Sequence, residues 1–179
     1  MKTEMDNREI HLVLGGCRSG KSRHALEKAD IRAAGTNFFV ATCVPADEEM
    51  KARVMRHQQE RDSRWTTVEA PLALPGVIRD KAADADVILI DCLTLWVSNL
   101  MERYENDESL MDQVRSLGKA LEEAACPVIV VSNEVGGGVV PENAMARRFR
   151  DLAGFANQHI AKCADRVTWM VAGIPVIVR

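Results

Sequence analysis

The sequence predicts an α/β fold in which a mostly parallel central sheet is flanked by helices. Short apolar, β-branched runs alternate with longer segments of helical periodicity, a pattern typical of strand–helix–strand units with right-handed crossovers. A glycine-rich loop joins the first apolar run to the first helical segment, at residues 15–22. Two short runs around a tight turn close the chain and predict an antiparallel hairpin at the sheet edge.

The elements follow from these patterns in chain order. The predicted core strands are residues 10–14, 38–42, 87–91 and 128–132, and the C-terminal hairpin strands are residues 167–172 and 175–178. The segments with helix-period apolar residues are 22–32, 47–61, 93–103, 110–124 and 142–164. The polar stretch 102–109 is interpreted as a mobile connection between two helices.

The size and composition predict one compact domain over residues 1–179. The chain has 179 residues, of which 47% are hydrophobic and 27% charged, so it can bury a substantial core. A net charge of -3 without a Lys/Arg block argues against a nucleic-acid surface. The charged N-terminus has no apolar signal region, and no apolar stretch has membrane-spanning length, so we expect a cytoplasmic protein.

Five cysteines occur at positions 17, 43, 92, 126 and 163, without C-x-x-C spacing. An odd, scattered set of this kind indicates neither a zinc site nor a disulfide framework. We expect reduced thiols, most of them buried.

The glycine-rich loop fits the phosphate-binding pattern G-x-x-x-x-G-K-[ST]. Its glycines let consecutive N–H groups point at phosphate oxygens, and the following helix adds the positive end of its dipole. The lysine of such a loop reaches the β- and γ-phosphate oxygens, and the final hydroxyl ligates Mg²⁺. The loop residues are Gly15, Gly16, Cys17, Arg18, Ser19, Gly20, Lys21 and Ser22.

Asp91 ends the apolar run 87–91, which is the Walker B arrangement. In a doubly wound sheet the carboxyl end of such a strand lies beside the phosphate loop. We therefore expect Asp91 to hold Mg²⁺, directly or through water, together with Ser22.

His57 lies on a strongly polar helical segment among Arg53, Arg56 and Arg61. The residues alone leave its role open, because a single surface histidine is usually a solvated helix residue. The arginines would depress its pKa by like-charge repulsion and could hold phosphate oxygens if this helix faces the loop. For the other three histidines a surface or hydrogen-bonded structural role is the better interpretation.

The segment 131–143 leaves a core strand and enters a helix through three consecutive glycines. Such loops at the carboxyl ends of strands often line ligand sites, and polar Asn133 and Glu134 favour that role. A signalling GTPase carries N-K-x-D near this point. The sequence here lacks the Lys and the Asp, which disfavours that class.

An ordered set of motifs closely resembles one family, the bifunctional adenosylcobinamide kinase / adenosylcobinamide-phosphate guanylyltransferase of cobalamin biosynthesis. The likeness covers nearly the whole chain, to the C-terminal A-G-I-P-V. The motifs are G-G-x-R-S-G-K-S at 15–22, A-T-C at 41–43, R-x-x-x-H-x-x-x-R at 53–61, W-T-T-V-E at 65–69, D-C-L-T-L-W-x-S-N-L at 91–100 and S-N-E-V-G-x-G-x-V-P-E-N at 132–143.

The resemblance implies two reactions in one subunit: phosphorylation of the aminopropanol hydroxyl of adenosylcobinamide, then transfer of GMP from GTP onto that phosphate. In this family the second step uses a guanylylated histidine, and His57 occupies its position. Some relatives carry two adjacent histidines there, whereas this chain has Arg56 before His57. GTP, ATP for the kinase step and Mg²⁺ are the implied substrates and cofactor.

The resemblance also implies a set of nucleotide contacts beyond the loop and a homotrimer with sites near subunit borders. These contacts are Ala41, Thr42, Cys43, Gln58, Gln59, Glu60, Arg61, Glu69 and Asp91. Two other hypotheses remain: a phosphate-loop kinase of another small metabolite, and a non-catalytic, nucleotide-controlled binding module. The first leaves the segment around His57 without a role, and the second lacks a further domain to control.

Overall fold

The computed structural model describes residues 8–44, 48 and 63–179. Within these residues the strands form one seven-stranded sheet with the order β3-β2-β4-β5-β1-β6-β7. The elements are β1 (Ile10–Gly15), α1 (Lys21–Asp30), β2 (Asn37–Ala41), β3 (Trp65–Glu69), α3 (Leu74–Lys81), β4 (Val87–Asp91), α4 (Leu93–Arg103), α5 (Asp107–Glu123), β5 (Val128–Asn133), α6 (Ala144–Cys163), β6 (Arg166–Val171) and β7 (Ile174–Ile177).

The sheet is parallel except at one edge. All neighbouring pairs from β3 to β6 are parallel, and only β6 and β7 pair antiparallel. Ala172 and Gly173, between these two strands, have φ values of 51° and 83°. Two successive positive φ values are typical of the tight hairpin turns whose twist matches that of the strands. The predicted mostly parallel sheet with an antiparallel C-terminal edge is confirmed.

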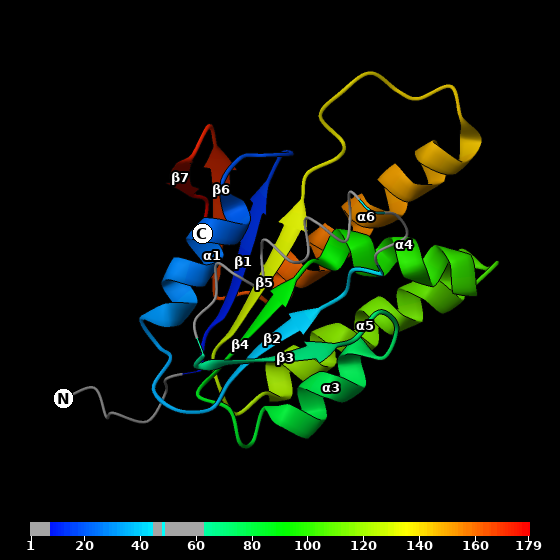
Figure 1. The fold of residues 1–179 in the computed structure, drawn as a ribbon. Coiled ribbons are helices and arrows are strands. Elements are labelled where there is room, and N and C mark those ends of the chain that lie inside the picture. Colours follow the sequence, from blue (N-terminus) through cyan, green and yellow to red (C-terminus); the bar gives the residue numbers. More distant parts are fainter. Residues whose placement is uncertain (1–7, 45–47, 49–62) are drawn as a thin grey trace.

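The two faces of the sheet carry separate hydrophobic clusters because successive strand residues point to opposite sides. Leu12 and Ile88 belong to the larger cluster, which contains buried residues of α3, α4, α5 and α6. Their neighbours Val13 and Leu89 belong to the smaller cluster, which includes buried alanines of α1. Figure 1 shows α1 apart from the group formed by the other helices. Both faces of the central strands are thus covered, as a parallel sheet requires.

Two described elements were not predicted. The strand β3 lies at the sheet edge, where only Trp65 is buried, so its sequence carries a weak apolar signal. The helix α3 contains Pro75 and Gly76, two residues that normally count against a helix. Pro75 is tolerated because it stands in the first turn, where a backbone N–H has no helical partner.

The connection predicted over 102–109 is shorter than expected. The helix α4 continues to Arg103 and α5 begins at Asp107. Asn106 caps α5, because its side-chain oxygen accepts hydrogen bonds from the backbone N–H groups of Glu108 at 2.7 Å and Ser109 at 3.4 Å. The polar residues that suggested a loop are a helix cap and an acidic first turn.

The cysteine prediction was partly wrong. All five thiols are free, but only Cys92 and Cys126 are buried, while Cys43 and Cys163 are half-buried and Cys17 is exposed. Cys17 is open because it lies in the glycine-rich loop rather than in a core element. Burial raises the pKa of Cys92 and of Cys126 to about 11, so these thiols are protonated at neutral pH.

Two further expectations are limited by the described residues. The helix predicted over 47–61 lies outside them except for Glu48, which is helical. Among the helices that are described, none combines the length and apolarity needed to cross a bilayer.

Candidate active site

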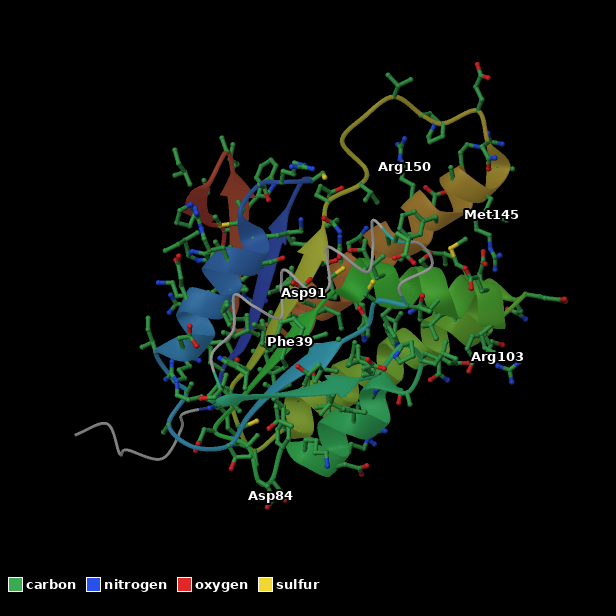
Figure 2. All side chains as sticks on the ribbon, in the orientation of Figure 1. Phe39, Asp84, Asp91, Arg103, Met145 and Arg150 are labelled. Carbon is green, nitrogen blue, oxygen red and sulfur yellow. The ribbon has the colours of Figure 1, made fainter. Side chains whose placement is uncertain are left out.

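One edge of the sheet gathers the predicted site residues. Because β1 to β5 run parallel, their carboxyl ends meet at the same edge. Gly15 at the end of β1 lies opposite Asn133 of β5, while Ala41 of β2 lies opposite both Glu69 of β3 and Asp91 of β4. Figure 2 shows Asp91 at this end of its strand. In open α/β sheets, ligands bind outside the carboxyl ends of the strands.

The glycine-rich loop joins β1 to α1 through a sharp turn. A side chain at Gly15 would overlap Ser19 Oγ and approach the Met170 carbonyl oxygen to 3.0 Å, so this position accepts only glycine. Gly20 adopts a φ of 87°, which L side chains rarely take. The backbone N–H of Gly173, in the β6–β7 turn, donates to the Ser19 carbonyl at 3.0 Å. The C-terminal hairpin therefore supports the loop from the side.

Lys21 is directed into the curve of this loop. Its Nζ donates to the Gly16 carbonyl oxygen at 3.1 Å, and the residue is only 8% exposed. Ser19 Oγ is also buried and has no hydrogen-bond partner among the described residues. The first turn of α1 contains no acidic residue and no side-chain cap. Its backbone N–H groups and the lysine charge can therefore bind an anion such as a triphosphate.

Ser22 and Asp91 are the candidate Mg²⁺ ligands. Both residues are half-buried, Ser22 in the first turn of α1 and Asp91 at the carboxyl end of β4. In the part of the chain that is described, no group of three His, Cys, Asp or Glu side chains could hold a metal. A hydroxyl and one carboxylate nevertheless fit Mg²⁺, which commonly takes one or two protein ligands and completes its shell with phosphate oxygens and water.

Asn133 lies between the phosphate loop and Asp91 at the carboxyl ends of the strands. The strand β5 separates β1 from β4, so the phosphate loop and Asp91 share one edge with Asn133 between their strands. The Asn133 backbone N–H and Nδ2 both donate to Thr94 Oγ1, at 3.0 and 2.9 Å. The sequence signal for this residue is a polar side chain that ends the buried run of β5. Neither Asn133 nor Thr94 is among the nucleotide contacts that the resemblance implies.

Thr42 supports the end of β4. Its side chain is fully buried, and its hydroxyl donates to the Cys92 carbonyl at 2.7 Å and accepts from the Cys92 N–H at 2.8 Å. Its backbone N–H donates to the Asp91 carbonyl at 3.3 Å. The polar groups of Thr42 are thus engaged within the protein, and they fix the backbone on both sides of the Asp91–Cys92 bond. Ala41 and Cys43 beside it are half-buried.

Asn99 ties together the chain segments that follow β2 and β3. Its Nδ2 donates to the Thr42 carbonyl at 2.8 Å and to the Pro71 carbonyl at 3.0 Å. One turn earlier in α4, the indole N–H of Trp96 donates to the Leu72 carbonyl at 3.0 Å. These bonds give the polar members of the D-C-L-T-L-W-x-S-N-L motif a structural role: they position the loops at this edge of the sheet.

The charges of Asp91 and Lys21 both affect the pKa of the buried Cys92. Burial is the main cause of its raised pKa, the Asp91 carboxylate adds to the effect, and the Lys21 ammonium opposes it. The two charged groups of the site therefore lie near the same buried thiol. Glu69, at the end of β3, is exposed.

Five predicted site residues fall outside the described part of the chain, namely His57, Gln58, Gln59, Glu60 and Arg61. Of the other histidines, His11 is buried within β1, and its Nε2 lies 2.9 Å from Thr168 Oγ1. Burial lowers the pKa of His11 to about 4. This confirms a hydrogen-bonded structural role for His11. His24 and His159 lie in α1 and α6.

A family model described as cobinamide kinase / cobinamide phosphate guanyltransferase matches residues 11–178. The chain belongs to this family. The match begins in β1 and ends beyond β7, so it includes every element of the sheet.

Three relatives of known description align with most of this chain. A bifunctional adenosylcobalamin biosynthesis protein, CobP of Pseudomonas aeruginosa, is 41% identical over 165 residues, which are 92% of this chain and 94% of the relative. Proteins of the same description named CobU, from Salmonella typhimurium and Escherichia coli, are 40% and 38% identical over 180 residues. In both cases the alignment covers 94% of this chain and 98% of the relative.

Solved structures share the fold at low identity. A KaiC-like protein from Pyrococcus horikoshii aligns with a TM-score of 0.52 and 16% identity, over 90% of this chain and 70% of that one. The flagellar accessory protein FlaH from Methanocaldococcus jannaschii gives 0.53 and 12%, over 96% and 78%. A third structure, an ATPase domain, gives 0.53 and 14%, over 91% and 69%. These likenesses support the phosphate-loop NTPase-like fold.

Proposed function

We propose that this enzyme phosphorylates adenosylcobinamide and then transfers GMP from GTP to the product, giving adenosylcobinamide-GDP. The observation that carries the proposal is the family match over residues 11–178. The phosphate loop, with Lys21 held in its curve, supplies the nucleotide site that both reactions need. A kinase of another metabolite would explain the loop but not the match along the whole chain.

In the kinase step the hydroxyl oxygen of adenosylcobinamide attacks the γ-phosphorus of ATP or GTP. The bond from this phosphorus to the bridging oxygen breaks, the nucleoside diphosphate leaves, and the hydroxyl proton is released to solvent. Lys21 and the loop N–H groups neutralise and orient the phosphates. Ser22 and Asp91 would hold Mg²⁺, and the bound ion would offset charge on the phosphate oxygens. Thr42 and Thr94 keep Asp91 and Asn133 at fixed positions through the hydrogen bonds described above.

In the guanylyl-transfer step a neutral nitrogen of His57 attacks the α-phosphorus of GTP, and pyrophosphate leaves. The phosphate oxygen of adenosylcobinamide phosphate then attacks the same phosphorus, the P–N bond breaks, and the histidine is regenerated. One difficult transfer becomes two easier ones. We assign Arg61 to charge neutralisation, and Gln58, Gln59, Glu60 and Glu69 to nucleotide contacts.

The finer features of the proposal follow the family. We propose a single domain over residues 1–179 that assembles into a homotrimer in the cytoplasm, where GTP and ATP are available. The corrinoid and the nucleotides are its partners, and a nucleic acid is not.

Labelled GTP tests the two reactions separately. Incubation with α-labelled GTP is expected to leave acid-labile label on the protein, and added adenosylcobinamide phosphate should remove it. Incubation with γ-labelled GTP or ATP and adenosylcobinamide should label the corrinoid. Label on the corrinoid from the γ-position without any protein label from the α-position would show a kinase only, and the guanylyl-transfer half would be wrong.

Replacing Asp91 with asparagine is expected to raise the Mg²⁺ concentration needed for half-maximal kinase activity. Mutation of an outer-shell partner of a metal site costs on the order of 10–100-fold in metal affinity or activity, and we expect an effect at least this large for a carboxylate that holds the ion directly or through water. Asp91→Asn keeps the size of the side chain, so the melting temperature should change little. Mg²⁺ titrations of the kinase rate measure the effect, with exposed Asp80→Asn as the matched control. Identical titrations for Asp91→Asn and the wild type would remove Asp91 from the metal site.

A further inference from the structure

A basic cavity lies at the amino ends of the strands, opposite the carboxyl ends that carry the phosphate loop. Its volume is about 620 Å³, within the usual range of small-ligand pockets. The polar residues that line it are Arg8, Glu9, Arg32, Asp165, Arg166 and Arg179. It adjoins the amino ends of β1 and β6, and the six residues of β1 separate it from the phosphate loop by roughly 20 Å at the usual rise of a strand. It is therefore distinct from the nucleotide site.

The carboxylates of this cavity are already engaged. Glu9 Oε1 accepts from Arg166 Nε at 2.7 Å, and Glu9 Oε2 accepts from Arg32 Nη2. Asp165 Oδ2 accepts from the backbone N–H of Ile10 at 2.8 Å. Burial raises the pKa of Glu9, but the hydrogen bonds from both arginines outweigh it and lower that pKa below its usual value. Both acids are thus accounted for by contacts within the protein.

The side chains that line the cavity carry a net positive charge, because four of them are arginines and two are acidic. Glu9 pairs with both Arg32 and Arg166, but one carboxylate cannot neutralise two guanidinium groups. Arg179 Nη1 donates to an uncharged acceptor, the Ala161 carbonyl, at 3.2 Å. The acidic side chains therefore do not balance the positive charge around the cavity, and an anion there is favoured.

We propose that the cavity binds a phosphate-bearing anion as a second site, separate from the nucleotide site. A phosphate monoester carries roughly two negative charges at neutral pH, which suits a lining of net positive charge. Guanidinium groups bind phosphate through paired N–H donors, and four arginine side chains line the cavity. The ligand class is a phosphorylated small molecule or free phosphate.

The test uses the full chain with its nucleotide site saturated by a non-hydrolysable GTP analogue, so that binding at the phosphate loop is suppressed. Inorganic phosphate is then titrated by calorimetry at constant ionic strength. We expect one remaining site per chain, with affinity at least ten-fold weaker in Arg32→Gln. Arg115→Gln is the matched control, because Arg115 also pairs with two carboxylates, Glu108 and Asp112, but on the exposed face of α5.

The outcomes separate binding from folding. Absence of a remaining phosphate site, or equal affinity in Arg32→Gln and the wild type, would overturn the proposal. If Arg32→Gln does not fold, Arg179→Gln replaces it under the same two criteria, because it leaves the Glu9 ion pairs intact. Malonate, a dianion with carboxylates, distinguishes the ligand class: binding as tight as that of phosphate would refute the assignment to phosphate groups.

Discussion

Lys21→Ala is expected to reduce the kinase and guanylyl-transfer rates together, each by about 10²- to 10³-fold, the usual effect of removing one preorganised donor to a developing charge. Both reactions attack a phosphorus of a nucleoside triphosphate, and both build up charge on its phosphate oxygens. Lys21 is held at the centre of the loop by its bond to the Gly16 carbonyl, so its ammonium group needs little rearrangement to meet a phosphate. Steady-state assays of each reaction with purified protein measure the effect.

The control for this prediction is Lys28→Ala. It makes the same substitution in the same helix, at an exposed position away from the loop. Its two rates should equal those of the wild type. Near-normal kinase turnover in a folded Lys21→Ala protein would mean that the loop does not bind the transferred phosphate as assigned.

The sequence predicted the central strands and the loop because each carries its own local signal. The runs in β1, β4 and β5 are buried on both faces, so almost every residue is apolar. The loop pattern is similarly self-contained, since its glycines are required by the backbone at Gly15 and Gly20. Strand-end residues such as Asp91 could be placed at one edge as soon as the sheet was known to be parallel.

The support beneath the site could not be predicted, because it depends on contacts between distant segments. Thr42 bonds Cys92 fifty residues away, and Asn133 bonds Thr94 thirty-nine residues away. The local sequence around either threonine gives no sign that its side chain makes these bonds. The strand order was also needed to place β5 between β1 and β4 and thus Asn133 between Gly15 and Asp91. The same holds for the basic cavity, whose arginines are spread from residue 8 to residue 179.

Replacement of His57 is expected to separate the two chemistries. Guanylyl transfer through a covalent intermediate needs a nitrogen nucleophile, whereas phosphoryl transfer to a hydroxyl needs mainly positioning and charge neutralisation. His57→Ala or His57→Asn should therefore abolish protein labelling from α-labelled GTP and the formation of the GDP-linked corrinoid. Kinase activity should remain within roughly ten-fold of the wild type, because no interaction made in its transition state is removed. Label transfer from the α- and γ-positions, measured on the same preparations, gives both numbers.

The matched control is His24→Asn, which removes a histidine from α1 beside the loop and should leave α-labelling intact. His11 is a poor alternative nucleophile, because its ring is buried and bonded to Thr168 near the amino end of β1. Covalent label that persists in both His57 variants would show that another residue is the nucleophile. Peptide mapping would then distinguish His24 from His159. Loss of both activities in a well-folded His57→Asn protein would instead place His57 in a shared nucleotide site. In that case the activities would no longer distinguish a nucleophile from a binding residue. Mapping of the guanylylated peptide would then be the test of the covalent role.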